Sequence, residues 1–574
     1  MNSMEKSLKE YTRWSAQKLP PELAAELAEL RGDEKNIYDR FCKDLSFGTS
    51  GMRGRMGAGT NRINSVTLSR AAKGIAAWLL DRFDRPKLLI AYDTRINSRE
   101  YAVGMGELIA GRGVSVCILG EATPVPFLSY AVRAMGLSAG VMITASHNPK
   151  EYNGCKVYDE HGNQINDKQA AELEQYISQI DMFETEADEE KRPTEQPALR
   201  SVESGLKQSY LAAVTASIPR FDTAQASRAA LSEVKICYTA LNGTGNSYVP
   251  ELLRGLGMPS ENIAEVEVQN KRSGSFQTCP YPNPERIEVF DEAIRCCRAQ
   301  QEKPQLILAT DPDSDRLGVM CLNEESGEES TYSKLSGNQV GELLFDYICE
   351  CRSQEDKGAA EQRPQVAFKS FVSSPLTEKL AAAHGIQLRN VFTGFKNIAH
   401  GMQRLEESGE GEFVFGFEES LGYLCGDYTR DKDAILAAGL VCMAAARLAS
   451  RGKTLTDRLE EIYQSYGYQS EAPFEIEYED ERDRKKANRI MDELFAGKLK
   501  GCMEQKYTIK KEYCYRQQQM YSAETEEGHR LIVRPSGTEP KLKIYIFAKG
   551  QSREAAAANA EALRRQTERL LRDC

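Results

Sequence analysis

The chain has 574 residues, of which 41% are hydrophobic and 28% are charged, and its formal net charge is -11. A chain of this length is too long for one hydrophobic core, so two to four domains are expected. The negative charge argues against nucleic acid or an anionic membrane surface as the main partner, although local arginines can still bind a small anionic substrate.

No segment has the length of a membrane span. The longest apolar stretch, residues 434–446, is short and rich in alanine, which indicates a buried core helix. The first six residues lack the apolar centre of a signal peptide. The fifteen cysteines are scattered, without a CxxC or a four-ligand zinc pattern. These features predict a reduced, cytoplasmic protein with no membrane partner.

Strand and helix signals alternate over most of the chain. The predicted strands fall in three rounds: 88–91, 114–119 and 139–144; 234–238, 263–268 and 306–310; 366–370, 386–391 and 413–417. The predicted helices are 98–111, 125–135, 337–351 and 431–450. This rhythm predicts α/β domains with largely parallel sheets and crossover helices. The polar segment 184–197 is expected at the surface or at a boundary.

The last hundred residues follow another pattern. A charged helix over 481–495 precedes strand-like runs, and a charged, alanine-rich helix begins near residue 552. The strand-like runs are 507–513, 530–533 and 543–547. Strands with helices at both ends predict a small α+β domain.

Three aspartates follow the apolar run 306–309 at every second position: Asp311, Asp313 and Asp315. Alternate side chains of an extended segment point the same way, so the three carboxylates can converge on one point. Hard oxygen ligands on a tight loop suit Mg²⁺. A solvated acidic turn that closes a strand is the alternative. The strand-then-loop placement favours the metal site.

Ser146 lies directly after the predicted strand 139–144, in the run Thr144-Ala145-Ser146-His147-Asn148-Pro149. Loops at the carboxyl ends of parallel strands are where open α/β sheets bind their ligands. A serine there is either a turn residue or a nucleophile. No Gly-x-Ser-x-Gly surrounds it, which excludes a hydrolase elbow.

The segment 534–541 combines Arg534, Ser536, Gly537 and Thr538. This combination would make a phosphate clamp, although the spacing is not that of a Walker motif. The guanidinium and the two hydroxyls can donate hydrogen bonds, and the glycine lets backbone N–H groups approach an oxyanion. A simple hairpin turn is equally compatible with this sequence.

Two further loops are weaker signals. Glu418 and Ser420 end the predicted strand 413–417 and could bind sugar hydroxyls, or could start a helix. The glycine-rich segment 47–54 carries Arg53.

Taken together, these five loops resemble those of the α-D-phosphohexomutase family, and within it the bacterial type of phosphoglucomutase. The resemblance runs from about Phe47 to about Ile546, and the four signature loops occur in family order. It implies three similar α/β domains with mixed, largely parallel sheets around a cleft, and a smaller C-terminal α+β domain. The expected domains are residues 1–205 with the serine loop, 206–322 with the metal loop, 323–462 with the sugar loop and 463–574 with the phosphate loop.

The resemblance also implies roles for individual residues. Ser146 corresponds to the phosphoserine and joins the three aspartates as a metal ligand. Residues implied in catalysis beside Ser146 are His147, Lys156 and Arg53. Residues implied in substrate binding are Arg316, Lys396, Glu418, Ser420, Arg534, Ser536, Gly537 and Thr538. Which of them is the general acid or base stays open.

Two positions depart from the family pattern. Ser314 stands in the metal loop where many relatives carry a smaller residue, and its side chain is expected to point away from the aspartates. Asn242 stands where relatives commonly carry histidine, so we leave its loop out of the expected site.

The implied enzyme interconverts glucose 1-phosphate and glucose 6-phosphate through the phosphoserine, with Mg²⁺ as cofactor and glucose 1,6-bisphosphate as intermediate and activator. Its partners are small sugar phosphates, and it is a monomer or a dimer. A phosphopentomutase or phosphomannomutase would use the same residues. A non-catalytic sugar-phosphate-binding relative is disfavoured because no key residue is lost, and a Mg²⁺-dependent phosphatase is a third possibility.

Overall fold

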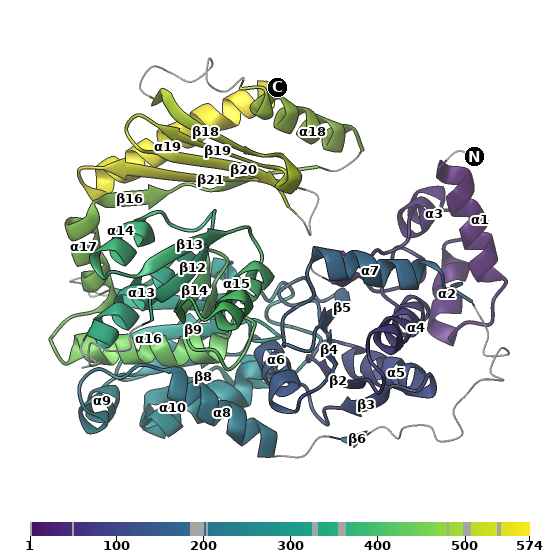
Figure 1. The fold of residues 1–574 in the computed structure, drawn as a ribbon, viewed down its shortest axis with the longest axis horizontal. Coiled ribbons are helices and arrows are strands. Elements are labelled where there is room, and N and C mark those ends of the chain that lie inside the picture. The colour runs from purple at the N-terminus through teal and green to yellow at the C-terminus, as the bar shows by residue number, and fades with distance from the viewer. Residues whose placement is uncertain are drawn as a thin grey trace.

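The computed structural model describes residues 3–48, 51–183, 200–201, 205–323, 331–353, 363–478, 481–497, 507–536 and 541–573. Within these residues the chain forms four sheets, arranged in chain order around the molecule (Figure 1). The mixed α/β architecture with a distinct last domain confirms the predicted fold class. The predicted surface segment 184–197 lies outside the described residues.

The first sheet has the order β1-β5-β4-β2-β3-β6. Its strands are β1 (Met52–Arg55), β2 (Lys87–Tyr92), β3 (Ser115–Ile118), β4 (Ala139–Ile143), β5 (Tyr152–Tyr158) and β6 (Arg200–Ser201). The accompanying helices are α4 (Ser65–Arg82), α5 (Ser98–Gly111), α6 (Val125–Ala134) and α7 (Asp167–Ser178). β2, β3 and β4 run parallel as predicted, whereas β5 returns antiparallel to β4. The serine loop therefore connects a buried parallel strand to an antiparallel one.

The second sheet has the order β11-β10-β9-β7-β8. Its strands are β7 (Ile236–Thr239), β8 (Ile263–Glu265), β9 (Leu306–Thr310), β10 (Leu317–Asn323) and β11 (Thr331–Lys334). The helices in this part are α8 (Gly205–Ser217), α9 (Ala224–Leu231), α10 (Tyr248–Leu256), α11 (Glu267–Asn270) and α12 (Asp291–Ala299). β10 is antiparallel to β9, so the aspartate motif forms the turn of a hairpin.

The predicted strand over 263–268 is wrong at its end, since β8 stops at Glu265 and α11 begins at Glu267. Val268 is 53% exposed on α11, while Gln269 is buried and its Oε1 accepts a hydrogen bond from Thr239 Oγ1 at 2.7 Å. This buried amide contact outweighs the strand propensity of the valines.

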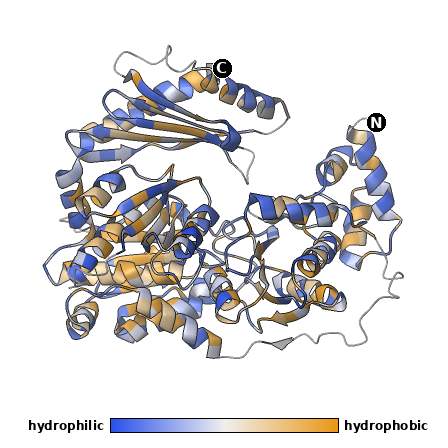
Figure 2. Ribbon diagram, in the orientation of Figure 1, coloured by the Kyte–Doolittle hydropathy of each residue, from blue (hydrophilic) through white to orange (hydrophobic). Residues whose placement is uncertain are grey.

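The third sheet has the order β13-β12-β14-β15. Its strands are β12 (Gln365–Ser370), β13 (Gln387–Val391), β14 (Glu412–Glu418) and β15 (Gly422–Leu424). The helices are α13 (Gly337–Ser353), α14 (Leu376–Ala383), α15 (Phe395–Ser408), α16 (Ala434–Ala449) and α17 (Leu455–Tyr466). α16 is buried along nearly its whole length and stands out as apolar in Figure 2, which confirms the predicted core helix. No helix of the described residues is both long and apolar enough to cross a membrane.

The last domain contains an antiparallel sheet, with the order β16-β21-β20-β19-β18 and β17 also paired to β21. Its strands are β16 (Tyr468–Glu471), β17 (Phe474–Glu477), β18 (Ile509–Tyr515), β19 (Met520–Thr525), β20 (Arg530–Pro535) and β21 (Lys541–Gly550). Helices α18 (Glu481–Phe495) and α19 (Arg553–Asp573) cover the outer face of this sheet (Figure 1). The opposite face meets the third domain through a small apolar cluster that includes Val372, Ile532 and Phe547.

Three helices precede the first sheet: α1 (Ser3–Ser15), α2 (Pro21–Glu29) and α3 (Glu34–Phe41). They share a core around Trp14 and Phe41 that also includes Ala58.

The predicted domain boundaries remain predictions. β11 pairs with β10, so the second sheet reaches past the boundary predicted at residue 322.

Candidate active site

Loops from all four sheets line one cavity of about 810 Å³. Ten basic side chains face it against six carboxylates, although the whole chain is acidic. The basic residues are Arg53, Arg55, Lys156, Arg286, Arg316, Lys396, Lys432, Arg534, Lys541 and Lys543. Such a lining attracts an anionic ligand in spite of the net charge.

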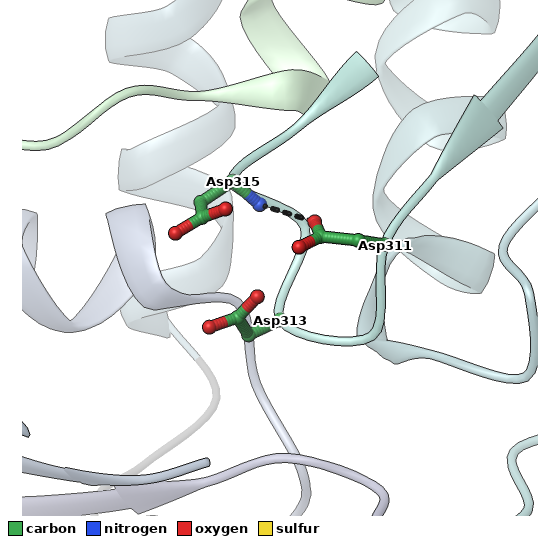
Figure 3. A group of neighbouring side chains, drawn as sticks. All are labelled: Asp311, Asp313 and Asp315. Carbon is green, nitrogen blue, oxygen red and sulfur yellow. Dashed lines mark hydrogen bonds between the residues drawn. The ribbon is translucent and has the colours of Figure 1, made fainter. Parts of the chain in front are cut away.

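The aspartate hairpin lies deep in this region. Asp311, Asp313 and Asp315 are fully buried, and they offer ligand oxygens that lie within 4.8 Å of one another (Figure 3). Asp311 Oδ1 accepts hydrogen bonds from the N–H groups of Asp315 and Arg316, both at 3.0 Å. Ser314 completes the turn with a left-handed φ of 55°. The hairpin therefore holds all three carboxylates toward one point, as the spacing predicted.

These residues fit a divalent cation. Asp313 Oδ1 and Asp315 Oδ1 are buried, and neither has a hydrogen-bond partner within the described part of the chain. A buried carboxylate oxygen without a partner is costly unless an ion satisfies it. An all-oxygen donor set is the type that Mg²⁺ prefers.

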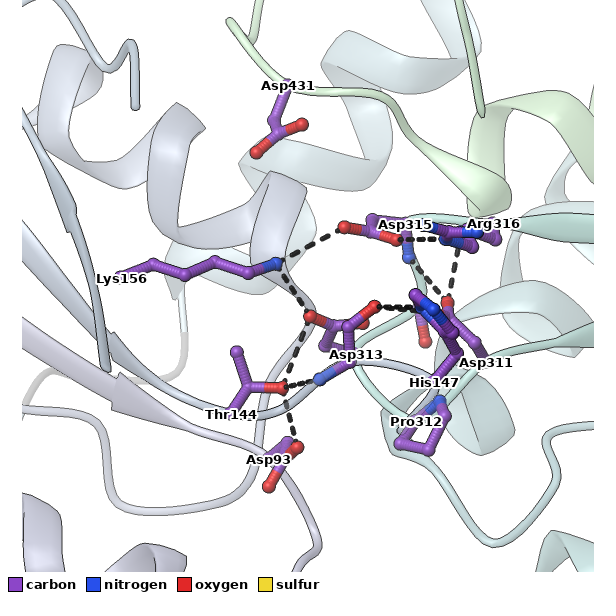
Figure 4. A network of polar contacts seen from close by, with 12 residues as sticks. Asp93, Thr144, His147, Lys156, Asp311, Pro312, Asp313, Asp315, Arg316 and Asp431 are labelled. Atoms are coloured by element: carbon purple, nitrogen blue, oxygen red, sulfur yellow. Dashed lines mark hydrogen bonds and ion pairs between the residues drawn. The ribbon is translucent and has the colours of Figure 1, made fainter. Parts of the chain in front are cut away.

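Two lysines balance part of the negative charge. Lys156 on β5 lies 3.0 Å from Asp313 Oδ2 and 3.4 Å from Asp315 Oδ2 (Figure 4), and Lys432 lies 2.8 Å from Asp315 Oδ2. Burial would raise the pKa of Asp315, but the two lysines overcome this effect and lower it. Burial likewise opposes the charged form of Lys156, yet the two aspartates raise its pKa. Lys156 is therefore a charged ion-pair partner at neutral pH. The sequence analysis had not identified Lys432.

Ser146 reaches the aspartates from the first sheet. It is 2% exposed and has a left-handed φ of 51°. Its Oγ donates a hydrogen bond to Asp311 Oδ2 at 2.9 Å and lies 3.1 Å from His147 Nδ1. Burial, with help from Arg316 and Arg53, holds the pKa of His147 well below its usual value, so the imidazole is neutral. The serine thus has an acidic cluster and a neutral imidazole within hydrogen-bonding distance.

Arg95, which the sequence analysis missed, holds the serine loop in shape. Its buried guanidinium donates to the carbonyl oxygens of Ser146 at 2.5 Å, Asn148 at 2.6 Å, Pro149 at 2.9 Å and Tyr152 at 3.0 Å. The guanidinium also lies 3.3 Å from Asp93 and over the ring of Phe276, 5.3 Å from its centroid. A planar guanidinium has several N–H donors, so it can hydrogen-bond several carbonyl oxygens at once.

Contacts between the first two domains fix the serine and the aspartates relative to each other. Thr144 Oγ1 donates to Asp93 Oδ2 at 2.7 Å and approaches Asp313 Oδ2 at 3.2 Å (Figure 4). The N–H of Val125 donates to the carbonyl of Asp313 at 2.9 Å.

The loop that carries Asn242 packs against the aspartate hairpin. Thr244 donates from its N–H to the carbonyl of Pro312 at 2.9 Å, and its hydroxyl lies 2.9 Å from Ser314 Oγ. Ser314 therefore points away from the aspartates, as expected. Asn242 donates to the carbonyls of Val268 and Lys271, so its side chain is used within the second domain.

The loop predicted to bind the sugar also reaches this cavity. Glu418 is buried, and its Oε1 accepts the N–H of Gly394 at 2.7 Å. Burial raises the pKa of Glu418 to about 7. Ser420 also lines the cavity. Lys396 lines it as well and forms an ion pair with Asp167 of the first domain at 2.5 Å.

The last domain contributes Arg534 and Ser536 to the lining. Arg534 Nη2 donates to Tyr545 OH at 2.9 Å, and the N–H of Ser536 donates to the carbonyl of Lys541 at 2.7 Å. Gly537 and Thr538, which belong to the predicted clamp, lie outside the described residues.

Two further predicted cations line the same space. Arg53 Nη1 donates to Asn148 Oδ1 at 2.7 Å, so it lies beside the serine loop. Arg316 Nη1 pairs with Glu285 at 2.9 Å. The described residues among those predicted for the site thus either line one cavity or form the buried cluster at its base.

Comparison with known proteins identifies the family. Models of the phosphoglucomutase/phosphomannomutase α/β/α domains I, II and III match residues 44–184, 208–324 and 336–466, and the model of the C-terminal domain matches 476–566. The chain belongs to this family. The phosphoglucomutase of Staphylococcus haemolyticus is 35% identical over 523 residues, covering 88% of this chain and 90% of that relative. A Staphylococcus aureus phosphoglucomutase is 32% identical over 544 residues, covering 92% and 93%.

A solved structure supports the phosphoglucomutase/phosphomannomutase fold. The open form of pp63/parafusin, a phosphoglucomutase from Paramecium, superposes with a TM-score of 0.68 at 19% identity, covering 91% of this chain and 94% of that one. As a member of the phosphoglucomutase/phosphomannomutase family, the chain is an enzyme of the isomerase class that acts as an intramolecular phosphotransferase. Helices α1 to α3 precede the first matched residue.

Proposed function

We propose that this enzyme interconverts glucose 1-phosphate and glucose 6-phosphate through a phosphorylated Ser146 and a glucose 1,6-bisphosphate intermediate. The observation that carries the proposal is the 2.9 Å contact between Ser146 Oγ and Asp311 Oδ2, because it joins a hydroxyl of one domain to an acidic cluster of another at the base of a basic cavity. The names of the staphylococcal relatives agree with glucose phosphates as substrates.

In the forward step, the phosphorus–Oγ bond of phosphorylated Ser146 breaks as a bond forms to the free hydroxyl of the sugar monophosphate. In the same step the sugar hydroxyl loses its proton to a base and the departing serine oxygen gains one; when the serine is phosphorylated again, the two proton transfers run in the opposite direction. His147 Nδ1 lies 3.1 Å from Ser146 Oγ and is neutral, so it is well placed to hold or return this proton. Lys156 stays charged and offsets negative charge on the transferred group.

Ser146, Asp311, Asp313 and Asp315 would hold Mg²⁺. A bound Mg²⁺ supplies positive charge that stabilises the phosphoryl oxygens during transfer. Lys156 and Lys432 lie against the aspartates and keep the hairpin in place beside the serine loop.

The bisphosphate must turn over so that either phosphate can face Ser146. This requires a remote anion site and a sugar site that accept both orientations. We assign the anion site to Arg534 and Ser536, and we predict that Gly537 and Thr538 complete it. Glu418 and Ser420, with Arg316, Lys396 and Arg53 around them, would contact the sugar ring and its phosphate.

The test is a comparison of substrates on the purified full chain with Mg²⁺ and catalytic glucose 1,6-bisphosphate. We expect kcat/KM to be highest for glucose 1-phosphate, and lower for mannose 1-phosphate and ribose 1-phosphate. A higher value for ribose 1-phosphate or mannose 1-phosphate would overturn the glucose assignment. Release of inorganic phosphate without formation of the isomer would overturn the mutase assignment.

A further inference from the structure

The loop that carries Glu418 and Ser420 is a short hairpin turn between β14 and β15. Glu418 pairs with Gly422 across the hairpin, so residues 419–421 form the turn. Ser420 is the middle residue of this turn and lines the cavity. Its hydroxyl has no hydrogen-bond partner among the described residues, so it is available to a ligand. Where this hydroxyl points depends on how the residues beside it are held.

Two buried serines hold Glu419, the first residue of the turn. Ser370 ends β12 and Ser373 lies in the turn that follows it, and both side chains are fully buried. Ser373 Oγ accepts the N–H of Glu419 at 3.1 Å and lies 3.3 Å from Glu419 Oε2. Ser370 Oγ donates to Glu419 Oε2 at 2.9 Å and lies 2.8 Å from Ser373 Oγ. The serine pair therefore holds both the backbone and the carboxylate of Glu419.

The pairing of β12 with β14 brings the serines to the turn. The two strands are parallel neighbours, and Lys369 lies opposite Phe417 in their register. The residues that follow these two positions therefore leave the sheet at the same edge, where ligands bind in open α/β sheets. The N–H of Ser373 donates to the carbonyl oxygen of Ser370 at 3.0 Å, and Lys369 Nζ donates to the carbonyl oxygen of Ser373 at 3.3 Å. The serine pair is thus itself held in place.

The other side of the turn is held as well. The carbonyl oxygen of Leu421 accepts the N–H of Leu317 at 3.0 Å, and Leu317 begins β10 directly after the aspartate hairpin. At Gly337, where α13 begins, an added Cβ would clash with the carbonyl oxygen of Glu419, so the helix packs closely against the turn. Ser420 lies between two residues that are each hydrogen-bonded to another element of the protein.

We propose that Ser370 and Ser373 are positioning residues, which act through Glu419 to aim the hydroxyl of Ser420 at a ring hydroxyl of the sugar phosphate. A hydrogen bond weakens steeply when its donor and acceptor leave the favoured distance and angle, so a turn that can shift binds the sugar less tightly. A hydroxyl can donate or accept, so Ser420 can serve the sugar in both orientations. The inference rests on the proposed function for the identity of the ligand.

The experiment measures binding and turnover separately on the full chain with Mg²⁺. The Kd of glucose 1-phosphate is measured by calorimetry on chains that also carry Ser146→Ala, and KM and kcat are measured on chains that keep Ser146. We expect Ser370→Ala to raise Kd and KM about fivefold and to change kcat by less than about twofold, because it removes a hydrogen bond to a carboxylate that positions the ligand-binding turn.

Thr377→Val is the matched control. It removes another buried hydroxyl of the third domain, which donates to the carbonyl oxygen of Ser374 at 2.7 Å on the first turn of α14. This variant should lower the thermal midpoint and leave Kd and KM near those of the parent.

A double-mutant cycle decides whether Ser370 acts through Glu419. Glu419→Ala should raise Kd about tenfold, and adding Ser370→Ala should raise it by less than about twofold more, because the two residues share one interaction. A merely structural serine would add its full effect in both backgrounds. Additive effects, or a parent-like Kd in Ser370→Ala, would overturn the inference.

Circular dichroism checks that each variant folds, and if Ser370→Ala does not, Ser373→Ala decides by the same rise in Kd. Failure of the proposed function has a different signature, since the chain with Ser146 would then form no glucose 6-phosphate, whatever the Kd values.

Discussion

The two ends of the cavity are built differently. At the inner end, Ser146 and the three aspartates are buried and tied together by contacts between the first two domains. At the outer end, Ser420, Arg534 and Ser536 are only half-buried and come from the third and fourth domains. In the proposed reaction the oxygen of Ser146 stays in one position, whereas the outer end accepts a sugar phosphate in two orientations. Pre-formed geometry is therefore concentrated where the bond changes occur.

The largest effect is expected at the inner end, from Ser146→Ala. This variant removes the oxygen that we propose to carry the phosphoryl group, so turnover of glucose 1-phosphate should fall roughly 10⁴-fold or more while the fold is kept. Steady-state kinetics and circular dichroism provide the measurement. Ser227→Ala, at a buried serine of the second domain, is the control and should keep parent activity. Near-parent turnover in Ser146→Ala would contradict the assignment of the reacting oxygen to Ser146.

Arg95→Lys tests whether the inner end depends on the shape of the serine loop. Lysine keeps the charge but cannot bind four carbonyls as the guanidinium fork does. We expect kcat to fall on the order of 100-fold with little change in KM, because a small displacement of the nucleophile is costly. Arg447→Lys, at a buried arginine of α16, should change thermal stability without this fall in kcat. Equal losses in both variants would mean that Arg95 is merely structural.

Arg534→Ala tests the outer end. Loss of a charged hydrogen-bond donor should raise KM about tenfold and change kcat less, if the clamp binds ground and transition states alike. Arg530→Ala, on the same strand but paired with Glu378, is the matched control and should leave KM near that of the parent. A larger loss in kcat than in KM would show that the outer end is specific for the transition state.

Glu342→Gln has the smallest expected effect and concerns the joint between the third and fourth domains. Glu342 is buried and accepts a hydrogen bond from Ser374 Oγ at this joint, where Gln469 of β16 also contacts Ser374 at 3.0 Å. Burial raises the pKa of Glu342 to about 8, whereas an unfolded glutamate titrates near ~4.3. Its contribution to stability is therefore fully present below about pH 4.3 and is lost as the pH rises to about 8.

Glutamine cannot ionise, so the thermal midpoint of Glu342→Gln should gain on the parent by roughly 5 °C between pH 5 and pH 8. Thermal melts of both proteins across this range test the expectation, with the exposed Glu410→Gln as control. A constant offset between variant and parent at every pH would refute it.

The sequence predicted the features that depend on local pattern. Buried strands such as β9 and β12, the core helix α16 and the converging aspartates follow from apolar runs and from the alternation of side chains. It did not predict antiparallel β5 and β10, whose pairing is set by sheet neighbours far along the chain. The helices α1 to α3 were also missed.

The same limit applies to the candidate site. Its motif residues follow strand ends and could be found from the sequence, whereas Arg95 and Lys432 act through contacts with residues distant in sequence. The run Asp431-Lys432-Asp433 was predicted only as the charged start of the helix over 431–450, whereas α16 begins at Ala434. An arginine that collects four carbonyls of another loop has no local signature at all.

The most direct test of the central claim is to find where the phosphoryl group is carried. The full chain is incubated with glucose 1,6-bisphosphate and Mg²⁺, and intact mass and phosphopeptide mapping are then compared for the parent and for Ser146→Ala. We expect one phosphoryl group per parent chain, located on Ser146 and lost on addition of glucose 1-phosphate, and none in the variant. Phosphorylation at another residue, or of the variant to the same extent, would contradict it.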